Sequence, residues 1–233
     1  MSKKKVVVMT AAFYSKPHGV RFDLQCKQIK VATSNGWPIL ISSGDHPETN
    51  KVMSSLGATV VVQDGRPHGG ERRRLDEMAL NMRADFGLWT EEKDYLLPHL
   101  PAAIERMKEK EASALLFNRS EESWSSWTPT QQESERFCNR YYNAMFGVEG
   151  EVYDPMLGPA MFDSRGLEIY LRCDPTVYGV DDIYPNLVAP LNIRAEGGYA
   201  TSLTVDLTYP PKQREEEEGA NRAVMMQKRA SQV

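Results

Sequence analysis

The sequence contains few residues that could crosslink the fold or hold a structural metal. Its 233 residues include three cysteines, Cys26, Cys138 and Cys173, which lie far apart and form no CxxC pair. An odd number of isolated cysteines argues against a disulfide framework and against a structural zinc site. We therefore expect reduced thiols and a cytoplasmic protein. A chain of this length can bury a core large enough to fold without such links.

Long apolar runs and an excess of basic residues are also missing. The first apolar run, residues 6–9, stops at polar Thr10 and is too short for a signal-peptide core or a membrane span. Lys and Arg together number 28 against 32 Asp and Glu, so the formal net charge is −4. Such a charge does not favour nucleic acid. We expect neither a nucleic-acid partner nor a membrane span.

Several catalytic motifs are absent as well. The chain has no GxSxG, no HExxH, no GKS of a P-loop and no GxGxxG. Its four histidines show no metal-ligand spacing to one another or to cysteine. These absences argue against a serine hydrolase, a zinc enzyme, a Walker ATPase and a Rossmann dinucleotide site.

Short apolar runs alternate with helical patterns in the first half of the chain. We predict strands over residues 6–9, 37–41, 58–63 and 86–89, and helices over 22–34, up to Ser54, and over 71–82. This β-α-β-α-β order predicts an α/β fold with a mostly parallel sheet. The later patterns predict helices over 98–110, 130–145 and 165–171 and strands over 112–117 and 200–207.

The loops after the predicted strands are candidate binding segments, because ligands of open α/β sheets lie beyond the carboxyl ends of the strands. These loops are residues 10–14, 42–45, 63–70 and 90–93. Residues 65–74 combine glycines, a predicted helix start and several arginines, which suits a phosphate-bearing ligand. The alternative is a simple turn followed by solvated arginines.

Two pairs of carboxylates follow non-helical segments. Glu91 and Glu92 come directly after a predicted strand, where a divalent cation on a diphosphate is often held, although they could also be surface charge. Asp181 and Asp182 follow Gly179 and offer a general base or a cation ligand, or serve the turn itself. Two tryptophans, Trp124 and Trp127, could form a sugar platform or pack in a core.

The order of these segments resembles a GT-A-type glycosyltransferase of the family-2-like kind, similar to mannosylglycerate synthases. The resemblance extends from residue 6 to about residue 229. Residues 87–92 look like the family's strand and DxD motif, with Thr90 at the first Asp and Glu92 at the second. Residues 156–165 look like an acceptor-side loop. Residues 178–181 are similar to an aromatic-Gly-aliphatic-Asp motif whose aspartate lies near the reacting sugar.

The resemblance implies one GT-A-like, Rossmann-like α/β domain over residues 1–233, with a nucleotide-sugar half over 1–93 and an acceptor half over 94–233. It implies sugar transfer from a nucleoside diphosphate sugar to a small hydroxyl acceptor. A divalent cation, Mg²⁺ or Mn²⁺, would bind weakly or not at all at the degenerate motif, and a homo-oligomer is compatible with the fold. The implied residues are Asp181 as base or electrostatic stabiliser, Glu92 for the metal, and Thr10, Ala11, Tyr14, Asp45, Gln63, Arg66, Arg72 and Gly158 for the substrates.

Two other functions stay open. A non-catalytic nucleotide- or sugar-binding protein, or a scaffold, could retain the same fold. A nucleotidyltransferase shares the doubly wound start. That function is disfavoured because residues 10–14, Thr-Ala-Ala-Phe-Tyr, stand where a glycine-rich signature would follow the first strand.

Overall fold

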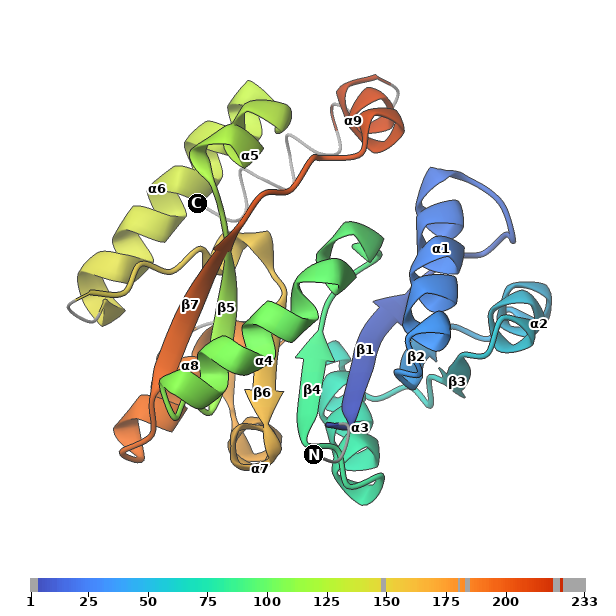
Figure 1. Ribbon diagram of the computed structural model, residues 1–233. Coiled ribbons are helices and arrows are strands. Elements are labelled where there is room, and N and C mark those ends of the chain that lie inside the picture. Colours follow the sequence, from blue (N-terminus) through green and yellow to red (C-terminus); the bar gives the residue numbers. More distant parts are fainter. Residues whose placement is uncertain (1–3, 148–149, 180, 183–184, 220–222, 224–233) are drawn as a thin grey trace. The chain divides into compact units, whose positions relative to one another are not determined.

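The computed structural model describes residues 4–147, 150–179, 181–182, 185–219 and 223. Figure 1 labels the strands and helices along the chain. The strands are β1 (Val6–Ala12), β2 (Ile39–Ser43), β3 (Thr59–Val62), β4 (Phe86–Trp89), β5 (Ala114–Arg119), β6 (Ala160–Asp163) and β7 (Ala200–Val205). The helices are α1 (Val20–Ser34), α2 (Pro47–Ser55), α3 (His68–Asn81), α4 (Leu100–Glu109), α5 (Glu121–Ser126), α6 (Pro129–Phe146), α7 (Ser164–Arg172), α8 (Pro185–Ala195) and α9 (Pro211–Glu218). Short 3₁₀ helices are η1 (Asp94–His99), η2 (Pro155–Leu157) and η3 (Pro175–Tyr178).

The strands form one sheet in the order β3-β2-β1-β4-β6-β5-β7. The pairs β1–β2, β2–β3 and β1–β4 are parallel, whereas β6 runs antiparallel to both β4 and β5. The parallel part is made by the β-α-β-α-β start of the chain. The predicted α/β fold class with a mostly parallel sheet is confirmed.

The predicted strands and helices do not include β6, α5, α8 and α9. The strand β6 has four residues and directly follows Gly158 and Pro159, so its apolar run is too short to stand out. Two prolines, Pro185 and Pro190, lie in α8 and hide its helical pattern. The segment of α5 is mostly polar and begins after the N-cap Ser120, whose side chain accepts from Ser123 N.

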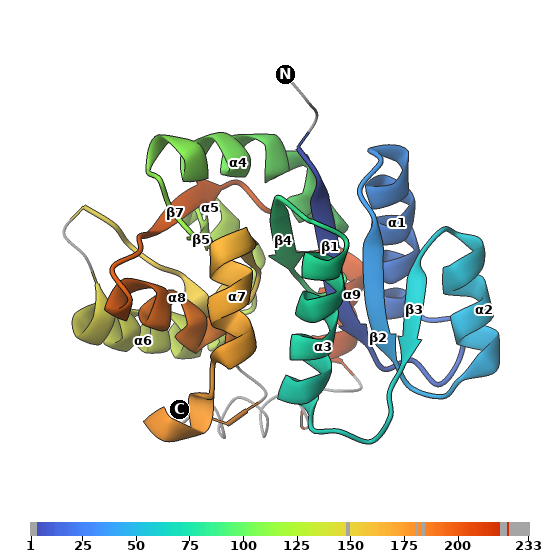
Figure 2. The same cartoon turned by 90° about the horizontal axis from the view of Figure 1, so that it is seen from below.

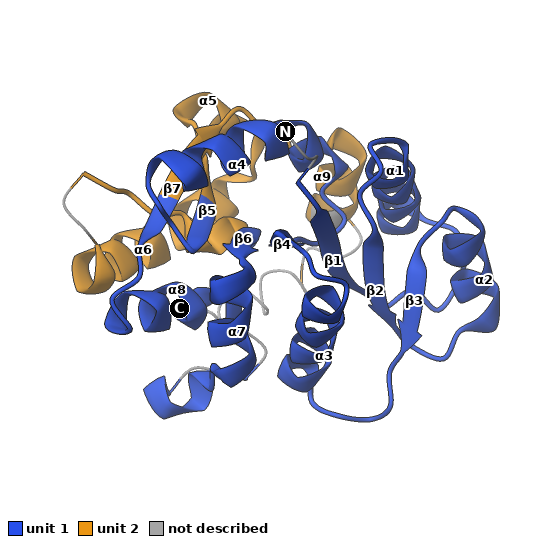
Figure 3. Cartoon of the chain, turned by 60° about the horizontal axis from the view of Figure 1, so that its bottom comes forward, with its two compact units in different colours: residues 1–116, 158–201 blue, residues 117–157, 202–233 orange. Residues whose placement is uncertain are grey.

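The chain divides into two compact units (Figure 3). Unit 1 contains Met1–Leu116 and Gly158–Thr201, and unit 2 contains Phe117–Leu157 and Ser202–Val233. Both β5 and β7 continue from one unit into the other. The single domain over residues 1–233 with a division at residue 93, which the resemblance implies, stays a prediction.

In unit 1, α3 and α7 cover one face of the sheet, and α1 and α4 cover the other (Figure 2). Side chains alternate between the two faces along each strand. Val7 and Met9 of β1 therefore join Leu75 of α3 and Tyr170 of α7 in one buried cluster. This packing fixes α3 over the ends of β1 and β2, which positions its first turn at the sheet edge.

Unit 2 contains a buried cation at its centre. The guanidinium of Arg119 donates to both carboxylate oxygens of Asp154, at 2.6 and 2.7 Å, and to Glu135 at 2.5 Å. It also lies over the rings of Trp124 and Trp127, at 3.5 and 5.0 Å from their centroids. Both tryptophans are buried, so they pack against this cation rather than forming an open platform.

Replacing Arg119 should destabilise the fold strongly. Arg119→Ala leaves two carboxylates buried without their cation, which should lower the free energy of unfolding by about 3–5 kcal/mol in urea denaturation. Arg136→Ala is the matched control, since Arg136 also lies over Trp124 and pairs with the exposed Glu121. Arg136→Ala should lower the free energy of unfolding by at most about 1 kcal/mol. Equal effects of the two variants would contradict the buried pair's role.

Candidate functional site

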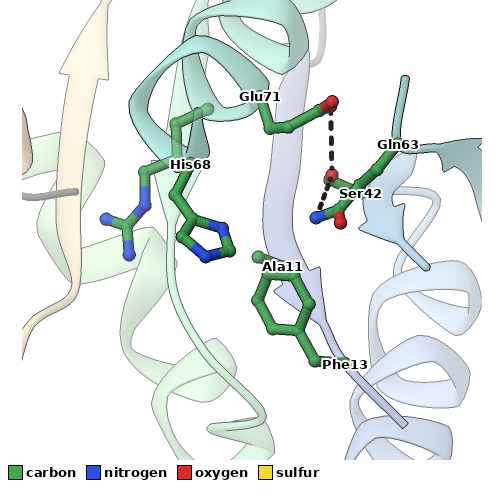
Figure 4. A pocket seen from close by; sticks show the side chains of 7 residues that line it. Ala11, Phe13, Ser42, Gln63, His68 and Glu71 are labelled. Atoms are coloured by element: carbon green, nitrogen blue, oxygen red, sulfur yellow. Dashed lines mark hydrogen bonds between the residues drawn. The ribbon is translucent and has the colours of Figure 1, made fainter. Parts of the chain in front are cut away.

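A cavity of about 380 Å³ opens in unit 1 where β1, β2 and β3 end beside the first turn of α3 (Figure 4). This volume lies in the range typical of small-ligand sites. The cavity is also at the edge of the sheet where α/β folds bind ligands. It is lined by Ala11, Phe13, Ser42, Gln63, His68, Glu71 and Arg72.

One wall of the cavity is aromatic. The side chain of Phe13 is 54% exposed and meets the ring of His68 edge to face, with centroids 5.1 Å apart. An exposed aromatic ring beside a cavity is a surface on which a planar ligand can stack.

The opposite wall is polar. The carboxylate of Glu71 is almost fully buried and accepts from the Ser42 hydroxyl at 3.3 Å and from Asp64 N at 3.2 Å. The Gln63 amide donates to the Ser42 oxygen at 3.4 Å. These contacts, two of them drawn in Figure 4, hold the loop after β3 against β2. They present an amide with further donor and acceptor capacity to the cavity.

Three of the four arginines in residues 66–74 are paired with carboxylates. Arg66 donates twice to Asp64, at 2.6 and 2.8 Å, and this lowers the pKa of Asp64 to about 2. Arg73 makes a bidentate pair with Asp182 at 2.8 and 2.9 Å, which raises the pKa of Arg73. Arg74 lies 3.6 Å from Asp64. Each of these three guanidinium groups therefore has a carboxylate partner within the protein.

Arg72 has a different environment. Its Nη1 donates to the amide oxygen of Asn186 at 2.8 Å, and its guanidinium lies 5.5 Å from the ring centroid of Trp89. Trp89 in turn donates from Nε1 to the fully buried Asp76 at 2.8 Å. Burial raises the pKa of Asp76 well above its usual range. Arg72, the cation that lines the cavity, is thus hydrogen-bonded to an amide and lies over an indole ring, and the buried Asp76 lies near enough to interact with its charge.

The segment carrying Asp181 lies against the start of α3. A Cβ atom at Gly69 would be 2.2 Å from the backbone oxygen of Asp182, so only glycine allows this approach. Asp181 is exposed and directly precedes this contact, while Val180 of the same motif lies outside the described residues. Gly69 adjoins the cavity residue His68. The structure therefore places Asp182, the residue after Asp181, against Gly69 beside the cavity residue His68.

The residues proposed for a metal have other partners. The buried carboxylate of Glu92 lies 3.3 Å from Arg21 and accepts from the Tyr14 hydroxyl. Burial raises the pKa of Glu92 and, with the charge of Glu92, that of Tyr14. Glu91 contacts Lys93 at 2.6 Å. Within the described residues no cluster of three or more metal-ligating side chains is present. These residues do not fit a divalent cation site.

The predicted site residues fall into three groups. Ala11, Gln63 and Arg72 meet at the cavity. Gly158 is linked to the cavity residue Arg72 through Asn186, whose amide nitrogen donates to the carbonyl oxygen of Gly158 at 2.9 Å. The other predicted residues do not line the cavity. Thr10 is buried, Tyr14 and Glu92 contact each other, and Arg66 pairs with Asp64. Asp45 and Asp181 are exposed.

Four cavity residues are missing from the sequence-based set, namely Phe13, Ser42, His68 and Glu71. Strand alternation already contains part of this signal. Residues 11 and 13 share one side of the chain after β1, and residue 10 points to the other. Thr10 is buried and its hydroxyl has no hydrogen-bond partner within the described structure.

Solved structures share this architecture. A CMP:2-keto-3-deoxy-manno-octonic acid synthetase complexed with CTP aligns with a TM-score of 0.53 at 13% identity, over 97% of this chain and 100% of the other. A Desulfovibrio desulfuricans G20 protein, described as a nucleotide-diphospho-sugar transferase, aligns with a TM-score of 0.50 at 13% identity. The alignment covers 98% of this chain and 96% of the other. The chain has the nucleotide-diphospho-sugar transferase fold.

A cytidylyltransferase from Leptospira borgpetersenii also shares the fold, with a TM-score of 0.51 at 10% identity over 87% of this chain and 77% of the other. Neither a family model nor a curated protein sequence matches the chain. Identities this low establish the fold alone. No helix in the described part of the chain has the length and apolarity to cross a membrane.

Two neighbouring glycines of α3 test the contact with residues 181–182. Gly69→Ala should displace Asp182 and weaken the Arg73 pair, lowering the melting temperature. Gly70→Ala is the control, because its Cβ would meet only the flexible side chain of Arg66, at 3.3 Å, and alanine favours a helix. Differential scanning calorimetry should rank Gly69→Ala clearly below Gly70→Ala. A reversed order would refute the close approach.

Proposed function

We propose that the chain is a transferase that binds a nucleoside diphosphate sugar in this cavity and moves the sugar to a small hydroxyl acceptor. The observation that carries the proposal is the composition of the cavity. It combines an exposed aromatic wall, a polar wall and one arginine whose guanidinium donates to an amide oxygen. Such a set of groups suits a base, a ribose and a diphosphate in that order. The finer similarity to mannosylglycerate synthases belongs to this proposal.

Four of the cavity residues have an assignment in this proposal. The base stacks on Phe13 and hydrogen-bonds with Gln63, while Ala11 leaves room for the ribose beside β1. The diphosphate contacts Arg72, near the amino end of α3, where the helix dipole also favours negative charge. Asp45, exposed after β2, lies outside the lining and could contact only the outer part of the nucleotide.

The reaction would proceed by attack of the acceptor oxygen on the anomeric carbon. A new C–O bond forms to the acceptor, the C–O bond to the diphosphate breaks, and the nucleoside diphosphate leaves with the bonding electron pair. Asp181 accepts the proton of the acceptor hydroxyl. Arg72 stabilises the negative charge that develops on the leaving diphosphate. No step is assigned to a metal, because Glu92 is occupied by Arg21 and Tyr14.

Nucleotidyl transfer is the second candidate, favoured by the names of two structural neighbours. That reaction attacks the α-phosphorus of a nucleoside triphosphate and releases pyrophosphate. A backbone that wraps phosphates closely requires glycine, whereas residues 11–14 of this chain are Ala-Ala-Phe-Tyr. A third candidate, a non-catalytic binding protein, would bind nucleotide without turning it over.

Calorimetry with UDP, GDP, ADP and CDP tests the donor site. We expect one of these diphosphates to bind, with nearly the same affinity in the presence and absence of Mn²⁺, because Arg72 rather than a metal carries the compensating charge. Parallel incubation with the triphosphates and a sugar 1-phosphate checks for pyrophosphate release. No binding of any diphosphate at millimolar concentration would refute the donor site, and pyrophosphate release would replace glycosyl by nucleotidyl transfer.

Substitution of Asp181 tests the chemistry. Asp181→Asn should lower sugar transfer from a pooled donor set by about 10²-fold or more, the range expected for loss of a general base. The melting temperature should stay unchanged, since Asp181 is exposed. Asp182→Asn is the control, because it weakens the pair with Arg73 and keeps Asp181. Unchanged transfer by Asp181→Asn would favour the non-catalytic protein.

A further inference from the structure

The side chain of Asn186 uses both ends of its amide in unit 1. The residue lies in the first turn of α8 and is 6% exposed. Its oxygen accepts from Nη1 of Arg72 at 2.8 Å, and its nitrogen donates to the carbonyl oxygen of Gly158 at 2.9 Å. An amide with both ends engaged cannot rotate without breaking a hydrogen bond. The orientation of its oxygen toward Arg72 is therefore fixed.

The glycine at position 158 completes this arrangement. Gly158 has φ of +96°, a conformation that other L-residues rarely adopt. A Cβ atom there would meet nothing within 4 Å, so the glycine serves the backbone conformation and not a close approach. The turn before β6 thus directs its carbonyl to Asn186, and Asn186 directs its own oxygen to α3.

The choice of an amide keeps the charge of Arg72 available. The neighbouring arginines, Arg66 and Arg73, are held by carboxylates that cancel their charge. An amide oxygen fixes the guanidinium without a negative charge. Trp89, stacked on Tyr170 with ring centroids 6.1 Å apart, lies beneath the guanidinium, whose carbon is 5.5 Å from the centroid of the indole ring. The cavity wall therefore contains a guanidinium that is held in place by a hydrogen bond to an amide oxygen.

We propose that Asn186 is a positioning residue that fixes Arg72 as the cationic ligand of the nucleotide's diphosphate. This inference rests on the proposed function. A guanidinium held in advance loses less conformational entropy when it binds a diphosphate. Aspartate at this position would keep the acceptor oxygen. It would also neutralise Arg72 and lose the donor to Gly158.

The test compares three probes by calorimetry, namely inorganic pyrophosphate, the tightest-binding of UDP, GDP, ADP and CDP, and its nucleoside. Asn186→Ala should lower the affinity for the diphosphate and for pyrophosphate about tenfold, the scale of one hydrogen bond to a charged group. Affinity for the nucleoside should not change. Asn186→Asp should produce at least the same selective loss while retaining the size of the side chain. It serves as the second variant if Asn186→Ala does not fold.

Two controls separate positioning from a structural role. Asn192→Ala, on the same helix, removes an acceptor of the Tyr178 hydroxyl and should change the affinity for none of the probes. In an Arg72→Ala background, Asn186→Ala should cause no further loss, because the residue through which it acts is gone.

Equal weakening of nucleoside and diphosphate, or additive losses in the double variant, would overturn the positioning role. So would unchanged diphosphate affinity in both Asn186 variants. These outcomes leave the proposed function standing, because the wild-type chain would still bind the diphosphate. Absence of diphosphate and pyrophosphate binding in the wild-type chain would instead refute the donor site itself and, with it, the role of Asn186.

Discussion

The charge at the start of α3 is the constraint on which the cavity depends. Four arginines between residues 66 and 74 bring positive charge to the edge of the sheet, and half-buried charges need partners. Carboxylates before and beyond the helix supply three of these partners and thereby tie down the loop after β3 and residues 181–182. The fourth partner is an amide. The same set of contacts that stabilises the helix start therefore leaves one cation at the cavity.

The first half of the fold could be predicted from the sequence because its signals are local. Apolar runs of four to seven residues alternate with helices that end at Asn35-Gly36 and Gly57, and this alternation forces parallel strands with crossovers. The later elements depend on tertiary contacts. The strand β6 exists because β4 and β5 pair with it on both sides, and α8 tolerates Pro190 within a buried helix. Neither pairing partners nor burial can be deduced from four apolar residues or from a proline-rich segment.

The residues of the candidate site could likewise be predicted only where local sequence signals identify them. Ala11, Gln63 and Arg72 follow from the rule that ligands lie beyond the carboxyl ends of strands. That rule names loops but not the side of the sheet to which each side chain points. Tyr14 and Glu92 come from the correct loops, yet they contact each other and Arg21 instead of the cavity. The pairing of Arg66 and Arg73 with carboxylates likewise depends on distances that a sequence does not contain.

The position of the Arg72 guanidinium at the cavity bears on whether a glycosyl or a nucleotidyl group is transferred. In glycosyl transfer the diphosphate leaves as a unit and gains negative charge, so one well-placed guanidinium beside it stabilises the transition state directly. In nucleotidyl transfer the charge develops between the α-phosphorus and a leaving pyrophosphate, which needs donors wrapped around a triphosphate. Residues 11–14, at the end of β1 and directly after it, are Ala-Ala-Phe-Tyr, and the ring of Phe13 meets that of His68 edge to face. An aromatic wall with a single fixed cation matches a diphosphate that departs better than a triphosphate that must be held along its length.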